Sequence, residues 1–325
     1  MSSEVERTLS LVVPVYAGES TLDTLVEECV PLFTTTVTPG GVSFRLVEII
    51  LVWDRGQDKS DEVMRRLAAR HPEVRPVWLA RNVGQHAATC AGISASQGEW
   101  VATLDEDGHH DPGEIARLLD AAFSTRARLV YAELVGGTSH GWVRDLLSRT
   151  AKSLNRRFFS EDRTAYFSSF RLIHGEVARI VAATAGPSVY LDAALAWSLG
   201  GSRQVPVQPR EERRPASSYT SAALRAHFVR LVGSAGPRPL RLIAGAGAAV
   251  ALTGVVFAMW VIVGALVGAI DVAGWASLMA TILLLGGLLL LALSAVAAYL
   301  AVSLRILLGQ PLFTIVDDDD LVFDP

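Results

Sequence analysis

The sequence has only two cysteines, Cys29 and Cys90, among its 325 residues. Two thiols cannot build a disulfide framework, and their scarcity suits a reducing compartment. Neither sign of charge is in large excess, because 29 basic and 33 acidic residues give a net charge of −4. This balance argues against nucleic acid as a partner. The opening stretch MSSEVERTLSLVVPVY contains no long apolar segment, so we expect no signal peptide there.

Charged residues are also absent from two long runs, Ile243 to Ile270 and Val272 to Leu304. Each run exceeds the roughly 20 residues that a helix needs to cross a bilayer. A helical hairpin buried in a soluble core is the alternative. Arginines flank both runs, and only Asp271 lies between them, which predicts that both flanks are cytosolic. We therefore expect a multi-pass protein of the cytoplasmic membrane, surrounded by membrane lipid.

Composition divides the chain into four expected parts. Residues 1–220 form a cytosolic domain, and 221–238 form an interfacial amphipathic helix and linker. Two transmembrane helices follow at 239–305, and 306–325 form a cytosolic tail with the solvated acidic run DDDD. Small-residue stretches such as GLLLLALSAVAA suit packing between subunits, so a homo-oligomer such as a tetramer fits the sequence, which leaves the oligomeric state open.

Apolar runs alternate with helix-like segments over the first 130 residues. The expected strands are 9–16, 45–54, 74–80 and 99–107, and the expected helices are 20–33, 60–72 and 84–98. This alternation predicts an α/β domain with a doubly wound parallel sheet. Ligands of such sheets bind outside the carboxyl ends of the strands. The polar residues at those ends are Pro14 to Glu19, Asp54 to Asp58, Arg81 with Asn82, and Asp105 to Asp107.

The stretch TLDEDGHHDP places several acids at the end of the fourth expected strand. In an extended segment, residues two apart point to the same side, so Asp105 and Asp107 should converge while Glu106 turns away. Two such carboxylates form a hard oxygen site suited to Mg²⁺ or Mn²⁺. A solvated acidic turn is the alternative. Zinc is not expected, because no further Cys/His set lies near the two histidines.

Several stretches together resemble the inverting family 2 glycosyltransferases with the GT-A fold. The likeness is to the branch that makes polyprenyl-phosphate sugars, which includes dolichol-phosphate mannose synthase and bacterial undecaprenyl-phosphate sugar transferases. The stretches are LSLVVPVYAGES, VEIILVWDRGQDKS, LARNVGQHAATCAGISASQGEWVATLDEDGHHDPGEI, VRDLLSR, ASSYT and YLAVSLRILLGQPLF. The resemblance implies a nucleotide-diphosphate sugar as donor and a polyprenyl phosphate, of undecaprenyl or decaprenyl type, as acceptor. It also implies Mg²⁺ or Mn²⁺ as cofactor.

The resemblance assigns roles to individual residues. Donor-binding residues would be Pro14, Tyr16, Glu19, Asp54, Arg81 and Asp105, and the metal ligands would be Asp105 and Asp107. The acceptor phosphate would meet Arg144, Ser148, Arg213, Ser217 and Tyr219. The catalytic set would be Asp105, Asp107, Arg144 and Arg213. From the residues alone, Arg144 and Ser148 could equally be the solvated face of a basic helix, and Asp54 an ordinary turn acid.

Some positions depart from the family pattern. Ala17 replaces the usual asparagine, Trp53 replaces an acid, and Pro215 replaces a glycine. The nucleotide, the sugar and the geometry of the acceptor loop therefore stay open. Two other functions also stay open: a membrane glycosyltransferase that acts on another glycolipid or glycan, and a non-catalytic nucleotide-binding membrane subunit. A processive polymer synthase is disfavoured, because the chain has no Gln-x-x-Arg-Trp motif.

Overall fold

The computed structural model describes residues 5–134, 168–186, 190–199, 201–208, 210 and 311–319, with isolated positions between 259 and 310. The chain divides into two compact units. One unit comprises Met1–Ala226 together with Pro311–Pro325, and the other comprises His227–Gln310. The continuous described segments all belong to the first unit.

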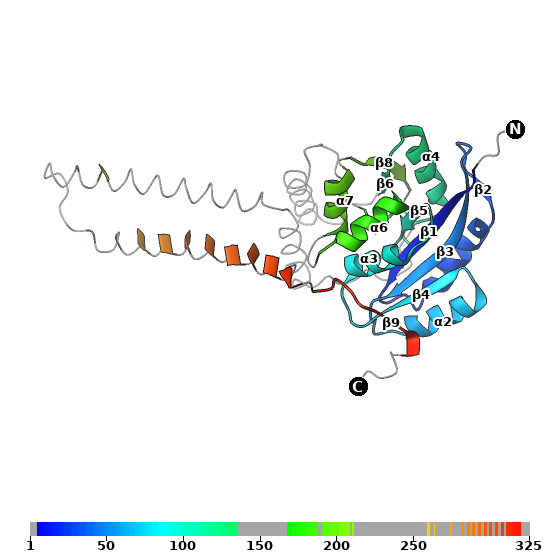
Figure 1. Ribbon diagram of the computed structural model, residues 1–325, viewed down its shortest axis with the longest axis horizontal. Helices are drawn as coiled ribbons and strands as arrows, with labels where there is room; N and C mark the ends of the chain where they lie inside the picture. The colour runs from blue at the N-terminus through cyan, green and yellow to red at the C-terminus, as the bar shows by residue number, and fades with distance from the viewer. Residues whose placement is uncertain are drawn as a thin grey trace. The chain divides into compact units, whose positions relative to one another are not determined.

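A nine-stranded sheet forms the centre of this unit (Figure 1). Its strands are β1 (Arg7–Val15), β2 (Thr36–Val37), β3 (Ser43–Trp53), β4 (Val74–Leu79), β5 (Trp100–Thr103), β6 (Leu129–Leu134), β7 (Arg171–His174), β8 (Arg203–Val207) and β9 (Ile315–Val316). Their order is β8-β6-β7-β5-β1-β3-β4-β9, and β2 pairs with β3 outside this path.

The parallel pairing predicted for the first half of the chain is confirmed. Strand β1 runs parallel to β3 and β5, and β3 runs parallel to β4. The sheet is mixed rather than parallel throughout, because β7 is antiparallel to both β5 and β6. The predicted end of the fourth strand is wrong. Strand β5 stops at Thr103, and after a last hydrogen bond from Leu104 N to Val12 O at 3.1 Å the chain no longer extends the sheet.

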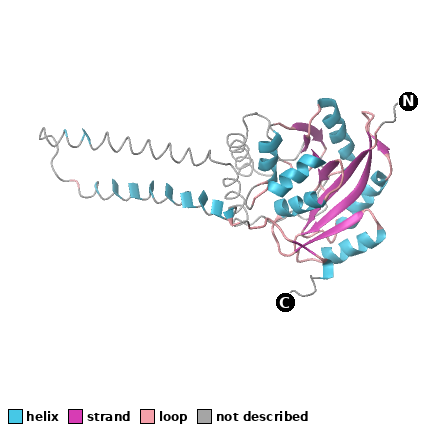
Figure 2. Ribbon diagram, in the orientation of Figure 1, coloured by secondary structure: helices cyan, strands magenta, loops and turns pink. Residues whose placement is uncertain are grey.

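Helices cover both faces of the sheet, which explains why its central strands are apolar on both sides (Figure 2). One face packs against α1 (Leu22–Cys29), α2 (Ser60–Arg70) and α4 (Ile115–Thr125), with the 3₁₀ helices η1 (Val30–Phe33) and η2 (Pro112–Glu114). The other face packs against α3 (Gln85–Ala95), α6 (Gly175–Thr184) and α7 (Leu191–Leu199). A Cβ at Gly92 would lie 2.4 Å from Val12 Cγ1, so the glycine lets α3 approach the sheet closely.

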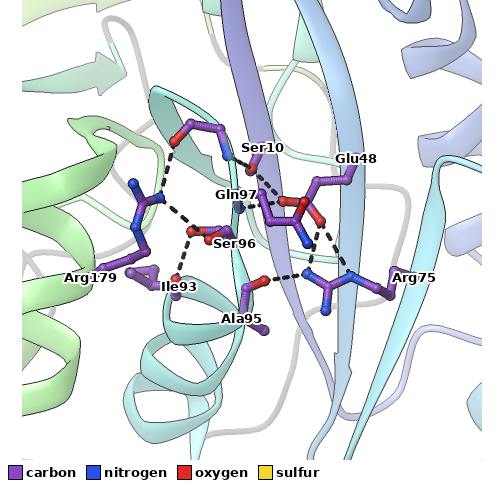
Figure 3. A network of polar contacts seen from close by, with 9 residues as sticks. Ser10, Glu48, Arg75, Ile93, Ala95, Ser96, Gln97 and Arg179 are labelled. Carbon is purple, nitrogen blue, oxygen red and sulfur yellow. Dashed lines mark hydrogen bonds and ion pairs between the residues drawn. The ribbon is translucent and has the colours of Figure 1, made fainter.

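A buried carboxylate ties the strands together several residues before their carboxyl ends (Figure 3). Glu48, which is 8% exposed, accepts hydrogen bonds from Ser10 Oγ at 2.7 Å, Gln97 N at 2.6 Å and Arg75 Nη2 at 2.8 Å. Ser10 Oγ also accepts a hydrogen bond from Gly98 N at 2.8 Å. This network joins β1, β3 and β4 to the segment before β5, so it helps to hold these strands in place relative to one another.

The described part of the C-terminal tail adds an edge strand to the sheet. Strand β9 pairs antiparallel with β4, and Ala80 N donates to Thr314 O at 3.0 Å. The guanidinium of Arg65 binds both oxygens of Asp318, with distances of 2.7 to 3.0 Å. The amino-acid pattern alone predicts only a solvated acidic tail here. At least one acid of the DDDD run instead anchors the tail to α2.

Across the described residues, no helix combines the length and the apolar character that crossing a bilayer would require. The interfacial helix expected at 221–238 lies outside the described residues, and the two spans expected at 239–305 lie largely outside them. Both therefore stay predictions.

Candidate functional site

A cleft of about 530 Å³ opens at the carboxyl edge of the sheet. It is lined by Pro14, Val15, Tyr16, Asp54, Asn82, Gly84, Gln85, Asp105, Glu106 and Asp107. These residues follow or end β1, β3, β4 and β5, or begin α3. Because parallel strands end at one edge, polar residues from distant parts of the sequence meet there, as the strand-end rule predicts.

The structure brings together five of the predicted site residues: Pro14, Tyr16, Asp54, Asp105 and Asp107 all line this cleft. Their roles stay predictions. Two other predicted donor-binding residues are not among the lining residues. Glu19 instead accepts a hydrogen bond from Lys59 N at 3.2 Å, and Arg81 is exposed after β4. The predicted acceptor residues Arg144, Ser148, Arg213, Ser217 and Tyr219 lie outside the described residues.

Asp54 holds the segment between β4 and α3 against the end of β3. Its carboxylate accepts hydrogen bonds from Val83 N at 2.6 Å and Gly84 N at 2.8 Å. The amide of Asn82 donates to the carbonyl oxygen of Asp54 at 3.0 Å. Burial raises the pKa of Asp54, although these hydrogen bonds act in the opposite direction. One wall of the cleft therefore depends on a carboxylate whose two oxygens both bind backbone.

The loop after β1 is held from two sides. Glu106 accepts hydrogen bonds from Tyr16 N and Ala17 N, each at 3.0 Å. A Cβ at Gly56 would lie 1.6 Å from the carbonyl oxygen of Tyr16, so only glycine allows the loop after β3 to approach this closely. Glu106 lines the same cleft as Asp105 and Asp107, so the expectation that it turns away from the two aspartates is wrong. Residues 104–107 follow the strand rather than continue it, so the side-chain alternation of a strand does not apply to them.

Asp105 is oriented by two other side chains. Gln85 Nε2 donates to its Oδ1, and Ser169 Oγ donates to its Oδ2. Burial raises the pKa of Asp105, and the negative charge of Asp107 raises it further. Asp107 itself accepts a hydrogen bond from His109 N at 3.0 Å. The site thus holds two carboxylates whose charges repel each other.

A divalent cation suits this pair of acids. No group of three or more His, Cys, Asp or Glu side chains that could hold a metal ion occurs among the residues that the structure describes. Two carboxylates can supply part of the shell of Mg²⁺ or Mn²⁺, because these cations usually keep water and take oxygens from a substrate phosphate. Burial is the main cause of the raised pKa of Asp105, and a positive charge would also offset the repulsion from Asp107 that adds to it.

Sequence reasoning did not identify Gln85 or Ser169 as site residues. Gln85 belongs to the Gly-Gln-His stretch that carried part of the family resemblance, so a signal for it existed. Ser169 lies 64 residues from Asp105 in the sequence, and no local pattern distinguishes it. Only the antiparallel return of β7 beside β5 brings Ser169 to Asp105.

The fold is similar to that of glucosyl-3-phosphoglycerate synthase from Mycobacterium tuberculosis, solved with Mn²⁺, uridine diphosphate and glucosyl-3-phosphoglycerate. The TM-score is 0.51, with 19% sequence identity, and the match covers 71% of this chain and 80% of the other. This likeness shows the α/β GT-A fold. A second structure of that synthase, with Mg²⁺ and uridine diphosphate, also gives a TM-score of 0.51 at 19% identity, covering 71% and 80% of the two chains.

Sequence relatives cover more of the chain. An undecaprenyl-phosphate 4-deoxy-4-formamido-L-arabinose transferase of Edwardsiella ictaluri (strain 93-146) is 29% identical over 255 residues, 78% of this chain and 76% of the relative. A bactoprenol glucosyl transferase of Shigella phage SfV is 26% identical over 294 residues, 90% of this chain and 92% of the relative. The model of glycosyl transferase family 2 matches residues 10–181, more than half of the chain. The protein is therefore an enzyme that belongs to glycosyl transferase family 2.

Proposed function

We propose that this protein transfers a sugar from a nucleotide-diphosphate sugar to a polyprenyl phosphate, with inversion at the anomeric carbon. The observation that carries the proposal is the acidic cleft at the carboxyl edge of the sheet, where Asp105 and Asp107 lie beside the loop after β1. The choice of acceptor is supported by relatives whose names include undecaprenyl-phosphate and bactoprenol transferases. The match to the phage relative covers 90% of this chain, so it includes part of the apolar runs at 239–305.

Asp105 and Asp107 would hold Mg²⁺ or Mn²⁺, which supplies positive charge beside the diphosphate of the donor. The protein's own groups prepare this site. Gln85 and Ser169 orient the carboxylate of Asp105, and Glu106 holds the backbone of Tyr16 at the cleft. Tyr16 is 45% exposed, so its ring is accessible to the nucleotide.

In the proposed reaction, an oxygen of the acceptor phosphate forms a bond to the anomeric carbon of the sugar. The bond between that carbon and the diphosphate oxygen breaks, and its electron pair leaves with the nucleoside diphosphate. A phosphate monoester is already anionic near neutral pH, so it needs no strong general base. It does need positioning and partial neutralisation. Arg144, Ser148, Arg213, Ser217 and Tyr219, all outside the described residues, are our candidates for that task.

The acceptor explains why such an enzyme would sit at the cytoplasmic membrane. Moving a polyprenyl chain into water costs about 0.8 kcal/mol per CH₂ group, so the reacting phosphate stays at the level of the lipid headgroups. Two spans at 239–305, with both termini cytosolic, would keep the cleft near that level. This placement is part of the proposal and rests on the two uncharged runs of the sequence.

The test is a transfer assay with the purified full chain, a panel of uridine, guanosine and thymidine diphosphate sugars, and radiolabelled undecaprenyl phosphate. We expect a butanol-extractable labelled product that requires Mg²⁺ or Mn²⁺ and disappears in Asp107→Ala. The control is Asp23→Ala, because Asp23 is 48% exposed and pairs with Arg66 on the surface. Unchanged product from Asp107→Ala would exclude the metal role. Nucleotide binding without product from any donor would favour a non-catalytic subunit.

A further inference from the structure

A continuous series of hydrogen bonds leads from α7 to the carboxylate of Asp105. Asp192 on α7 accepts a hydrogen bond from Arg171 Nη1. Arg171 Nε donates to Thr103 Oγ1 at 3.1 Å, and this hydroxyl donates to the carbonyl oxygen of Ser169. Ser169 Oγ then donates to Asp105 Oδ2. The last strand residue of β5 and the first of β7 therefore connect a buried ion pair to the cleft.

The burial of this ion pair needs an explanation. Asp192 is 5% exposed and Arg171 is 3% exposed. Removing two charges from water costs several kcal/mol per ion, and a well-packed apolar pair is often as stable or more stable. Stability alone is therefore a weak reason for this arrangement. A buried ion pair can instead fix one geometry for its neighbours, because its hydrogen bonds are strong and directional.

The direction of each hydrogen bond follows from the donors available. A guanidinium only donates, so the Thr103 hydroxyl must accept from Arg171. The single proton of that hydroxyl is then directed at the carbonyl oxygen of Ser169. This bond fixes the backbone of Ser169, whose own hydroxyl proton meets the carboxylate of Asp105. The donors and acceptors of this series cannot be exchanged, because the arginine side chain has no acceptor atom.

We propose that Arg171 and Asp192 are positioning residues which, through Thr103 and Ser169, hold Asp105 in the orientation in which it binds the cation. The inference rests on the proposed function, since it assumes that Asp105 is a metal ligand. Gln85 binds the other oxygen of Asp105, so the carboxylate is held from both sides. Preorganisation of this kind makes metal binding stronger, and losing such an outer partner typically weakens it by roughly 10- to 100-fold.

The test is the dissociation constant of Mn²⁺ alone, measured by electron paramagnetic resonance on the full chain. Ser169→Ala and Thr103→Val each remove one hydroxyl of the series, and we expect both to weaken Mn²⁺ binding by about 10- to 100-fold. Thr103→Ser keeps the hydroxyl and should retain the wild-type constant. Unfolding by urea is measured for every variant.

Ser10→Ala is the matched control. The Ser10 hydroxyl is buried and donates to Glu48 Oε1 at 2.7 Å, and it takes no part in the series that leads to Asp105. This variant should lose stability while Mn²⁺ binding stays unchanged. If lost stability alone weakened Mn²⁺ binding, Ser10→Ala and Ser169→Ala would behave alike.

Wild-type Mn²⁺ binding in both Ser169→Ala and Thr103→Val would overturn the positioning role. Asp107→Ala, measured in parallel, separates this failure from that of the proposed function. If Asp107→Ala also binds Mn²⁺ normally, the metal site itself is wrong and both proposals fall. If only Asp107→Ala loses binding, the metal site stands and the positioning role alone is refuted.

Discussion

Replacing Asp54 with asparagine should loosen one wall of the cleft without changing the size of the side chain. The carboxylate accepts one backbone N–H from Val83 and one from Gly84, at 2.6 and 2.8 Å. Asparagine has a single acceptor oxygen, and its NH₂ group would face one of these two donors. One hydrogen bond is therefore lost, and the other no longer involves a charge.

The size of the effect depends on these two bonds. A hydrogen bond to a charged group contributes about 1.5–3 kcal/mol, and one between neutral groups about 1 kcal/mol. Losing one hydrogen bond and weakening the other would cost more than about 2 kcal/mol if burial did not disfavour the charge of the carboxylate. Burial raises the pKa of Asp54, which shows that its charge is disfavoured there and offsets part of the loss. We expect the substitution to cost about 2 kcal/mol in the free energy that keeps the segment between β4 and α3 in place. If nucleotide binding requires this segment, the affinity for the nucleotide should fall about 30-fold.

The assay is calorimetric titration of UDP, GDP and dTDP, with Mn²⁺, into the full chain. Asp58→Asn is the control, because Asp58 also accepts two backbone N–H groups, from Glu19 at 3.0 Å and Ser60 at 3.2 Å, and does not line the cleft. Both variants should lose stability, but only Asp54→Asn should lose nucleotide affinity. Wild-type affinity in Asp54→Asn would refute this reasoning. Lost affinity with unchanged stability would instead indicate direct contact with the nucleotide, as the family resemblance implies.

Three further predictions concern stability. Asp318→Asn should lower the free energy of unfolding by at most about 1 kcal/mol in urea titrations, because Arg65 and Asp318 are 40% and 41% exposed. Glu48→Ala should cost about 3 kcal/mol in the same measurement and leave the donor KM unchanged, because it leaves several donors without an acceptor far from the cleft. Burial raises the pKa of Asp105 above its ordinary value of 3.8 in the folded protein. The protonated side chain therefore stabilises the fold fully below pH 3.8, and this stabilisation is lost as the pH rises through the higher pKa of the folded state. Asp105→Asn should therefore melt at a higher temperature than the wild type at neutral pH in EDTA, and this advantage should vanish in acid.

The position of the cleft could be predicted because it depends on local patterns and one topological rule. Apolar runs identify β1, β3 and β4, and parallel strands of this kind end at one edge, which brings Tyr16 and Asp54 together. The predicted end of β5 lies four residues too late, because the acids at 105 and 107 alternate with other residues as they would in a strand. Where a strand stops depends on its partners, and β7 pairs with β5 only as far as Thr103.

The contacts that could not be predicted join residues far apart in the chain. Strand β9 has two residues, too few to show a periodic pattern, and it forms because β4 is otherwise an edge with unpaired backbone groups. Ser169 reaches Asp105 through pairing that no local pattern encodes. Such contacts depend on the packed fold. The sequence indicates a residue that makes one only when the residue belongs to a known motif, as Gln85 does.

Asp105, Glu106 and Asp107 are three consecutive acids after β5, and each has different hydrogen-bond partners. Three carboxylates at one place repel one another, so each needs a partner of opposite polarity. Glu106 has the amides of Tyr16 and Ala17, and Asp105 has the side chains of Gln85 and Ser169. Within the described residues, Asp107 has a single hydrogen bond, from His109 N. Asp107 is thus the carboxylate with the most unused capacity, so its replacement should weaken Mn²⁺ binding more than the loss of any hydrogen bond to Asp105.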